Sequence, residues 1–172
     1  MVDFLKPVLD QKGGDLTSEE RNLFSVAFKN LISSKRSALR TIAAIEQNPK
    51  YSKFGERLVA YKKKIEESHY KDCEGIIEII KSKVLAKPCQ DEAKAFFLKM
   101  VADYYRYIAE TAQGDKLEQV KKEALKAYVD ANAINLHACN SIKLGLALNF
   151  SVFYYEVMKD NKKAISLADE SL

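Results

Sequence analysis

The sequence predicts an all-α fold of antiparallel helices stacked in chain order. Long stretches place apolar residues three and four positions apart, which is the spacing of one face of an α-helix. Only 6 Gly and 3 Pro occur in 172 residues, so few positions break a helix. No run alternates apolar and polar residues as a half-buried strand does. The connections between the expected helices are only a few residues long, which favours antiparallel neighbours.

The first long helix is expected over residues 17–47. Thr17-Ser18-Glu19-Glu20 has the pattern of a capping box, in which the Thr17 hydroxyl and the Glu20 carboxylate each accept from a free backbone amide. Asn48-Pro49 ends the helix, because a residue that precedes proline is pushed out of the α region. The apolar stripe of this helix is expected to contain Leu23, Val26, Ala27, Leu31, Ala38, Ile42 and Ile45.

Five further helices divide the rest of the chain. They are expected at residues 54–85, 91–113, 116–136, 143–158 and 161–172. Pro88 prevents the helix expected at 54–85 from continuing. Gly114 is expected in the C′ position that ends the helix at 91–113. Small residues on the following helix allow close approach by a neighbour. Its apolar face holds Val120, Ala124, Ala127, Tyr128 and Ala131.

The composition is that of a folded, water-soluble protein. Lys and Arg number 28 against 24 Asp and Glu, a net charge of +4, and 47 % of residues are hydrophobic. No run approaches the roughly 18 apolar residues of a membrane span, and the segment MVDFLKPVLDQ lacks the features of a signal peptide. The 3 Cys are odd in number and far apart, which fits neither a disulfide framework nor a zinc site. We therefore expect one domain over residues 1–172 in the reducing cytoplasm.

Residue types of catalytic and metal sites are present, but not at the spacing that such sites need. His69 and His137 lie far apart without a Cys or carboxylate at ligand spacing, and are expected to be helix-surface or interhelix residues. Glu66 and Glu67 are adjacent and point to different sides of a helix, so they do not form an acid–base pair. Cys73 lies on an apolar stripe and is expected to be buried. The sequence predicts no enzyme, metal site or cofactor.

One face of the first long helix gathers cations. Lys29, Ser33, Arg36 and Arg40 fall within a stripe roughly 60° wide that has no acidic member. The simpler interpretation is that these side chains form a helix face exposed to solvent. However, cations without an acidic neighbour repel one another unless something anionic meets them.

A second stripe lies on the helix expected at 91–113. Lys99, Asp103, Arg106 and Tyr107 lie within roughly 100° of one another. The bland interpretation is again a solvated face, with an intrahelical pair between Lys99 and Asp103. The alternative is a receptor for a phosphate dianion, because guanidinium forks and a phenol hydroxyl bind phosphate oxygens well.

Three segments of the chain resemble the 14-3-3 proteins, dimeric all-α adaptors that bind phosphoserine and phosphothreonine peptides. The segments are RNLFSVAFKNLISSKRSALRTIAAIEQ, FFLKMVADYYRYIAE and LGLALNFSVFYYE. The resemblance implies helices stacked into a curved, tetratricopeptide-like right-handed array with a concave peptide groove. It also implies a non-enzymatic adaptor that captures phosphorylated client proteins in this groove and regulates them by binding.

The resemblance gives both cation stripes a role. The family binds phosphate through a Lys and an Arg of one helix and an Arg-Tyr pair of another, which implies phosphate contacts by Lys29, Arg36, Arg106 and Tyr107. The implied peptide-groove residues are Asn149, Leu148, Val152 and Lys99. Asp103 and Arg40 are expected to be supporting residues that contact the phosphate-binding side chains or lie at the rim of the site. Asp103 stands three residues before Arg106, where it could orient the guanidinium group.

Family members begin with an extra helix and end with a further helix and an acidic tail, and this sequence has no counterpart of these segments beyond the remnant MVDFLKPVLDQ. The family forms homodimers, which implies the same for this chain if such an N-terminal helix is present. The interface positions correspond to Ile42, Tyr61 and Lys64. Ser68 stands where the family has a Glu that pairs across the interface.

Two other functions remain open from the sequence. A phosphate-independent, tetratricopeptide-like scaffold would bind linear peptides on the same concave surface, and its binding would weaken little with ionic strength. A nucleic-acid-binding protein would use the basic stripes, although phosphate tracking needs cations spread along a surface rather than focused in one place. Neither a nucleic-acid nor a membrane partner is predicted.

Overall fold

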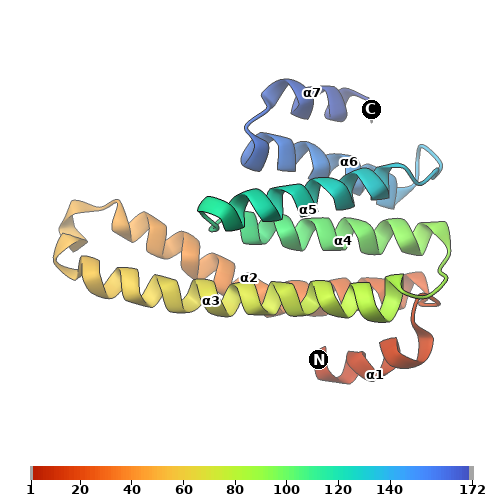
Figure 1. Ribbon diagram of the computed structural model, residues 1–172, viewed down its shortest axis with the longest axis horizontal. Helices are drawn as coiled ribbons and strands as arrows, with labels where there is room; N and C mark the ends of the chain where they lie inside the picture. The colour runs from red at the N-terminus through yellow and green to blue at the C-terminus, as the bar shows by residue number, and fades with distance from the viewer. Residues whose placement is uncertain (1, 171–172) are drawn as a thin grey trace.

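The computed structural model describes residues 2–170 and confirms the all-α antiparallel array, with no strand in that range. The helices stack in chain order from α1 to α7 (Figure 1). Their bounds are α1 Val2–Lys12, α2 Ser18–Glu46, the 3-10 turn η1 Pro49–Phe54, α3 Gly55–Ile79, the π-helical η2 Ile80–Leu85, α4 Asp91–Ala109, α5 Gly114–Asn132, α6 Ser141–Phe153, the π-helical η3 Tyr154–Met158 and α7 Asn161–Asp169.

The boundaries predicted from helix signals are confirmed at the start of α2. The Thr17 hydroxyl accepts from the Glu20 amide (3.2 Å) and the Glu20 carboxylate accepts from the Thr17 amide (2.9 Å), which completes the capping box. The prediction for Gly114 is wrong in its detail. α4 ends earlier, at Ala109, and Gly114 begins α5 with φ +57°, a conformation that glycine adopts at little cost. The last two residues of the helix predicted at 161–172 lie outside the described residues.

The predicted apolar stripe of α2 is partly wrong. Leu23, Val26 and Leu31 are 52 %, 49 % and 40 % exposed, although Ala27 and Ile42 of the same stripe are buried. The buried face instead runs through Phe24, Phe28, Ile32 and Leu39. Burial of the two phenylalanines removes more apolar surface from water than burial of Leu23 and Val26 would, which fixes the rotation of the helix.

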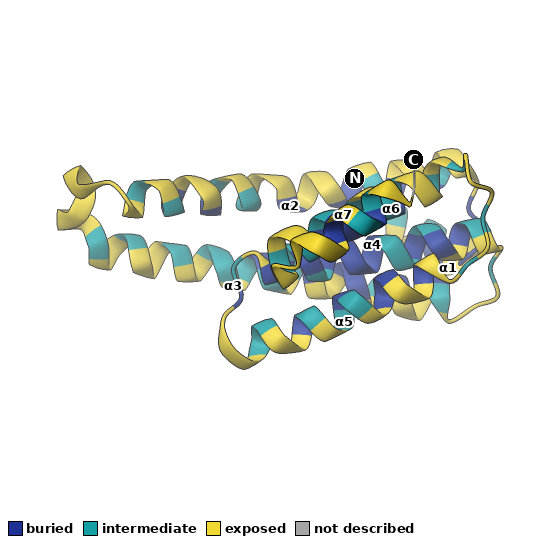
Figure 2. Ribbon diagram, turned by 90° about the horizontal axis from the view of Figure 1, so that it is seen from above, coloured by how far each residue is buried: buried dark blue, intermediate teal, exposed yellow. Residues whose placement is uncertain are grey.

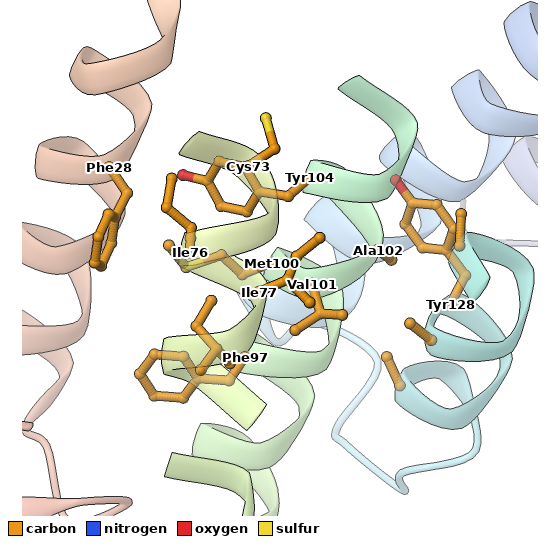
Figure 3. Packing of buried hydrophobic residues seen from close by; sticks show 14 of the residues in the cluster. Phe28, Cys73, Ile76, Ile77, Phe97, Met100, Val101, Ala102, Tyr104 and Tyr128 are labelled. Carbon is orange, nitrogen blue, oxygen red and sulfur yellow. The ribbon is translucent and has the colours of Figure 1, made fainter. Parts of the chain in front are cut away.

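The core is centred on α4, which contacts α3, α5 and α6. Figure 3 shows Phe97, Met100 and Val101 of α4 between the side chains of α2 and α3 on one side and Tyr128 of α5 on the other. All five apolar residues predicted for α5 are buried, and three of them are alanines that let α5 approach α4 closely.

The outer halves of α2 and α3 extend beyond this core as a hairpin joined by η1 (Figure 1). Seen from above, the end of the hairpin is almost entirely exposed, whereas buried positions concentrate along α4 and its neighbours (Figure 2). Between residues 2 and 170, no helix is both long and apolar enough to cross a membrane.

Candidate functional site

Three of the four residues predicted to contact phosphate lie together. The guanidinium carbon of Arg36, on α2, is 3.8 Å from the centre of the Tyr107 ring, and that of Arg106, on α4, is 4.8 Å from the same centre. Cation–π contact of this kind holds two positive groups near each other around one aromatic ring. Lys29 lies two turns before Arg36 on the same helix face and is exposed, and no hydrogen bond or cation–π contact joins it to Arg36, Arg106 or Tyr107.

Arg36 and Arg40 share a carboxylate that the sequence analysis did not assign. The Arg36 Nε donates to Glu110 Oε2 (3.1 Å) and its Nη2 donates to Oε1 (2.5 Å), while Arg40 Nη2 lies 3.6 Å from the same Oε1. The stripe has no acidic member of its own, and Glu110 of another segment supplies the anionic partner that its cations need. Glu110 reaches it from the end of α4, which a search along α2 alone does not detect.

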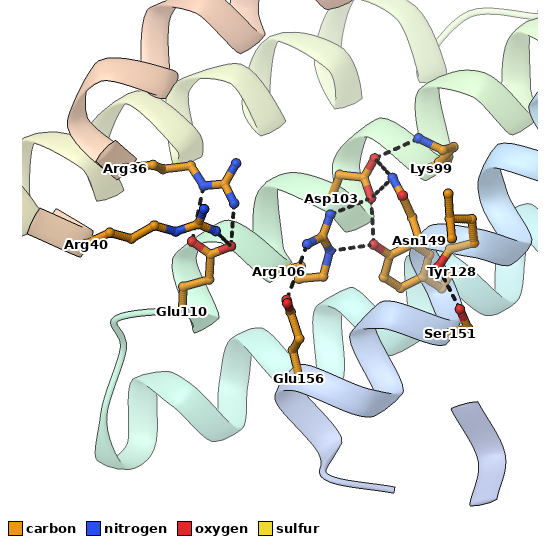
Figure 4. Close-up of polar contacts among 11 residues, drawn as sticks. Arg36, Arg40, Lys99, Asp103, Arg106, Glu110, Tyr128, Asn149, Ser151 and Glu156 are labelled. Carbon is orange, nitrogen blue, oxygen red and sulfur yellow. Dashed lines mark hydrogen bonds and ion pairs between the residues drawn. The ribbon is translucent and has the colours of Figure 1, made fainter. Parts of the chain in front are cut away.

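Asp103 is the centre of a second polar group (Figure 4). Its carboxylate accepts from Lys99 Nζ (2.8 Å), from the Tyr128 hydroxyl (2.6 Å) and from Asn149 Nδ2 (2.9 and 2.8 Å). Three helices, α4, α5 and α6, thus meet at one carboxylate. The predicted Lys99–Asp103 pair is present, but as one part of a buried network and not as a solvated pair on a helix face.

The same network holds Arg106. Its guanidinium is buried, donates from Nε to the Tyr128 hydroxyl (3.2 Å), and lies 3.6 Å from Asp103 and 3.8 Å from Glu156. Asp103 therefore contacts the guanidinium group three residues away, as the spacing suggests. Contacts with Tyr128, Asp103 and Glu156 set the orientation of the Arg106 guanidinium, so it is a preorganised donor.

Tyr107, whose ring contacts Arg36 and Arg106, lies next to the buried His69. Burial raises the pKa of the Tyr107 phenol, so that its hydroxyl stays protonated and able to donate. His69 is 1 % exposed and its Nε2 lies 3.4 Å from the Tyr107 carbonyl oxygen. Burial lowers the pKa of His69, and it raises that of the buried Cys73 to about 12, so both are uncharged packing residues near neutral pH.

The residues predicted for a peptide groove lie mostly on α6. Asn149 is anchored to Asp103, Leu148 is 62 % exposed, and Val152 is half-buried one turn further on. A cavity of about 420 Å³ opens beside the Arg36–Glu110 pair. Its lining includes Arg36, Arg40, Lys62, Glu66, Glu110 and Glu156, so carboxylates and cations face the same space.

The residues predicted for a dimer interface differ in their surroundings. Tyr61 is 58 % exposed and Lys64 is exposed, on the outer half of α3. Ile42 is only 5 % exposed and packs within the chain, so it offers little surface to a second copy. Ser68 accepts from Lys35 Nζ (2.6 Å) inside the chain.

Sequence reasoning missed Glu110, Tyr128 and Glu156 as members of the site. Glu110 stands four residues after Arg106, a spacing that could have indicated an acidic neighbour. No sequence signal distinguishes Tyr128 from an ordinary core residue, because its partners Asp103 and Arg106 lie on another helix. In residues 2–170, no cluster of three His, Cys, Asp or Glu side chains is suited to hold a metal ion.

Comparison with known proteins agrees with this architecture. The family model described as 14-3-3 protein matches residues 1–172. The chain is 41 % identical to 14-3-3 protein 3 of Entamoeba histolytica over 177 residues, which covers 99 % of this chain and 73 % of that protein. It is 40 % identical to 14-3-3 protein beta/alpha-1 of Oncorhynchus mykiss over 172 residues, which covers 98 % of this chain and 70 % of the relative. With a family match along its whole length and an all-α antiparallel array, the chain belongs to the 14-3-3 family of non-enzymatic adaptor proteins.

Proposed function

We propose that the protein is a cytoplasmic adaptor that binds peptides carrying phosphoserine or phosphothreonine and regulates the client proteins that contain them. The observation that carries this proposal is the meeting of Arg36 and Arg106 at the ring of Tyr107. Two guanidinium forks and a protonated phenol within one small region match the donors that a phosphate dianion needs.

The phosphate would replace Glu110 as the partner of Arg36. A phosphorylated serine brings a charge of about −1.5 to −2, whereas Glu110 brings a single negative charge. The phosphate can also accept from Arg106 and from the Tyr107 hydroxyl, while Glu110 already lies near Arg40 at 3.6 Å and can keep that contact. An unphosphorylated serine offers no such gain, so the modification acts as a switch.

The other predicted residues have supporting roles in this proposal. Lys29 is exposed on the Arg36 face of α2, and its long side chain can turn toward a bound phosphate. Asn149, held by Asp103, would donate to or accept from the peptide backbone beside the phosphoresidue. Leu148 and Val152 supply apolar contacts for the flanking side chains, and Lys99 and Asp103 keep the floor of the site in place.

Fluorescence polarisation with a labelled Arg-Ser-x-phosphoSer-x-Pro peptide tests the proposal directly. The phosphorylated peptide should bind, its dephosphorylated copy should not, and the affinity should fall steeply as ionic strength rises. Equal binding of both peptides, with little salt dependence, would instead identify a phosphate-independent helical scaffold.

We also propose that two copies associate through the outer part of α3, where Tyr61 and Lys64 are exposed. Two phosphate sites in one dimer would favour clients with two phosphorylated segments, because the second binding step becomes intramolecular. Sedimentation equilibrium of the native chain and of Tyr61→Glu tests this, with Tyr155→Glu, 61 % exposed on η3, as the control. A monomeric native protein over the whole concentration range would contradict the dimer.

A further inference from the structure

The positive charge of this chain is concentrated at the projecting end of the α2–α3 hairpin. Residues 48–64, the hairpin tip, contain six of the 28 Lys and Arg but one of the 24 Asp and Glu, a net charge of +5. The remaining residues hold 22 cations and 23 carboxylates, so they are close to neutral. Figures 1 and 2 show this segment extending past the packed body of the protein.

Most cations of the hairpin tip have no acidic partner. Lys62 pairs with Glu46 (2.7 Å), but the other five form no ion pair with any residue that the structure describes. These five are Lys50, Lys53, Arg57, Lys63 and Lys64. They differ in this from the cations of the candidate phosphate site, where Arg36, Arg40 and Arg106 each face a carboxylate. An external anionic partner would relieve the mutual repulsion of such a cluster.

Apolar side chains stand between these cations. Tyr51 and Phe54 on η1 are 37 % and 40 % exposed, and Val59 at the start of α3 is 60 % exposed. No residue of η1 is buried, so these rings are not part of the core. The ammonium groups of Lys50 and Lys53 lie 6.0 and 5.0 Å from the centres of the Tyr51 and Phe54 rings.

The hairpin tip has a defined backbone. Asn48 caps η1 by accepting from the Lys50 amide (3.1 Å), and Pro49 fixes the first residue of the turn. The aromatic rings and lysines of η1 are therefore presented together on a short, ordered turn.

We propose that the hairpin tip docks onto the surface of an anionic lipid bilayer. Lys and Arg would contact lipid phosphates and carboxylates, while Tyr51 and Phe54 insert into the headgroup region, where aromatic rings are favoured. A projecting end suits a flat, extended surface, whereas small-ligand sites in proteins are concave. The sequence alone predicts no membrane partner, because it contains no span. The inference depends on where the fold places exposed charges and rings.

The η1 part of this surface is separate from the candidate phosphate site, although Lys62 of the hairpin tip lines the cavity beside that site. Arg36 lies ten residues before the end of α2, which corresponds to about 15 Å along the helix axis. The hairpin tip overlaps the proposed dimer interface at Tyr61 and Lys64. Lys50, Tyr51, Lys53 and Phe54, which carry the inference, belong neither to that interface nor to the phosphate site.

Co-sedimentation with vesicles tests the inference. The chain should sediment with phosphatidylcholine vesicles that contain about 30 % phosphatidylserine, should not sediment with phosphatidylcholine alone, and should be released by salt. Lys50→Glu with Lys53→Glu should lower the partition coefficient at least tenfold, since each cation near such a surface contributes roughly fivefold. The control is Lys122→Glu with Lys126→Glu, the same charge change on the exposed face of α5, which should leave binding within about twofold of native.

Insertion of the rings can be followed separately, because the chain has no Trp. Phe54→Trp should give a fluorescence blue shift with the phosphatidylserine vesicles, and Val129→Trp, 49 % exposed on α5, should not. Circular dichroism and phosphopeptide binding of each variant report on folding and on the separate site.

The proposal is overturned if the native chain does not bind these vesicles, or if both charge-reversal variants lose binding equally. It is also overturned if single-stranded RNA or an acidic peptide binds the hairpin tip while vesicles do not, because the surface would then serve another class of partner.

Discussion

The guanidinium groups of Arg36 and Arg106 lie against the same aromatic ring, that of Tyr107, although they come from different helices. Arg36 donates to the Glu110 carboxylate, whereas Arg106 donates to the Tyr128 hydroxyl and forms an ion pair with Asp103. The two cations therefore differ in their partners. Arg106 contacts the buried Tyr128 and Asp103, whereas Arg36 pairs with Glu110, a single carboxylate whose side chain is 20 % exposed and which a ligand could replace.

Arg36→Lys should weaken binding of a phosphorylated peptide at least tenfold, or about 1.4 kcal/mol. Lysine keeps the charge but lacks the planar fork that binds two oxygens and stacks on Tyr107. Isothermal titration calorimetry measures the effect. Arg40→Lys, whose side chain is 69 % exposed, is the matched control and should change the affinity less than about threefold. Equal effects of the two variants would argue against the proposed role of Arg36.

Glu110→Gln should tighten phosphopeptide binding severalfold. The carboxylate competes with the phosphate for the Arg36 guanidinium, and the neutral amide competes much less. Glu67→Gln makes the same change of net charge at an exposed position of α3 and should have little effect. Weaker binding by Glu110→Gln would mean that Glu110 positions Arg36 and does not compete with the ligand.

Tyr128→Phe should destabilise the fold by about 1–3 kcal/mol, because it leaves the buried Asp103 carboxylate and the Arg106 Nε each without one partner. Urea unfolding gives the free energy. The same substitution at Tyr155, which is 61 % exposed, removes a hydroxyl in water and should change stability by less than about 0.5 kcal/mol. Equal stability of the two variants would show that the network contributes nothing.

Acidification should destabilise the protein through His69. Burial lowers the pKa of His69 in the folded state, so below its ordinary pKa of about 6.5 only the unfolded chain takes up the proton. The free energy of unfolding is therefore highest above that pH and falls as the pH drops toward the folded pKa, by up to about 1.4 kcal/mol for each pH unit. His69→Gln should lose this part of the pH dependence in urea titrations at pH 7.5 and 5.5, whereas His137→Gln, at an exposed position, should retain it. An unchanged pH dependence in His69→Gln would contradict the assignment.

The local signals of the chain were sufficient to predict the helices from α2 onward, but they did not predict α1 or the start of α5 at Gly114. The capping box at Thr17, the break at Asn48-Pro49 and the alanines of α5 each act within one or two turns of helix, so the residues that cause them are visible in the sequence. The rotation of α2 about its axis was harder to predict from the sequence. Two nearby stripes of this helix are apolar, and whether Leu23 or Phe24 is buried depends on the space left by the neighbouring helices, chiefly α3.

The sequence by itself determined that the chain is a helical array and, through three segments, which family it resembles, because both are encoded in local spacing and residue type. Only the tertiary structure decided that Glu110 faces Arg36, that Asp103 joins three helices, and that the cation-rich residues 48–64 lie at the projecting end of the α2–α3 hairpin. The first two contacts join residues far apart in the chain, and the third depends on where the fold places one segment relative to the packed core. Such interactions cannot be read from the sequence, because electrostatic forces act through space and not along the chain.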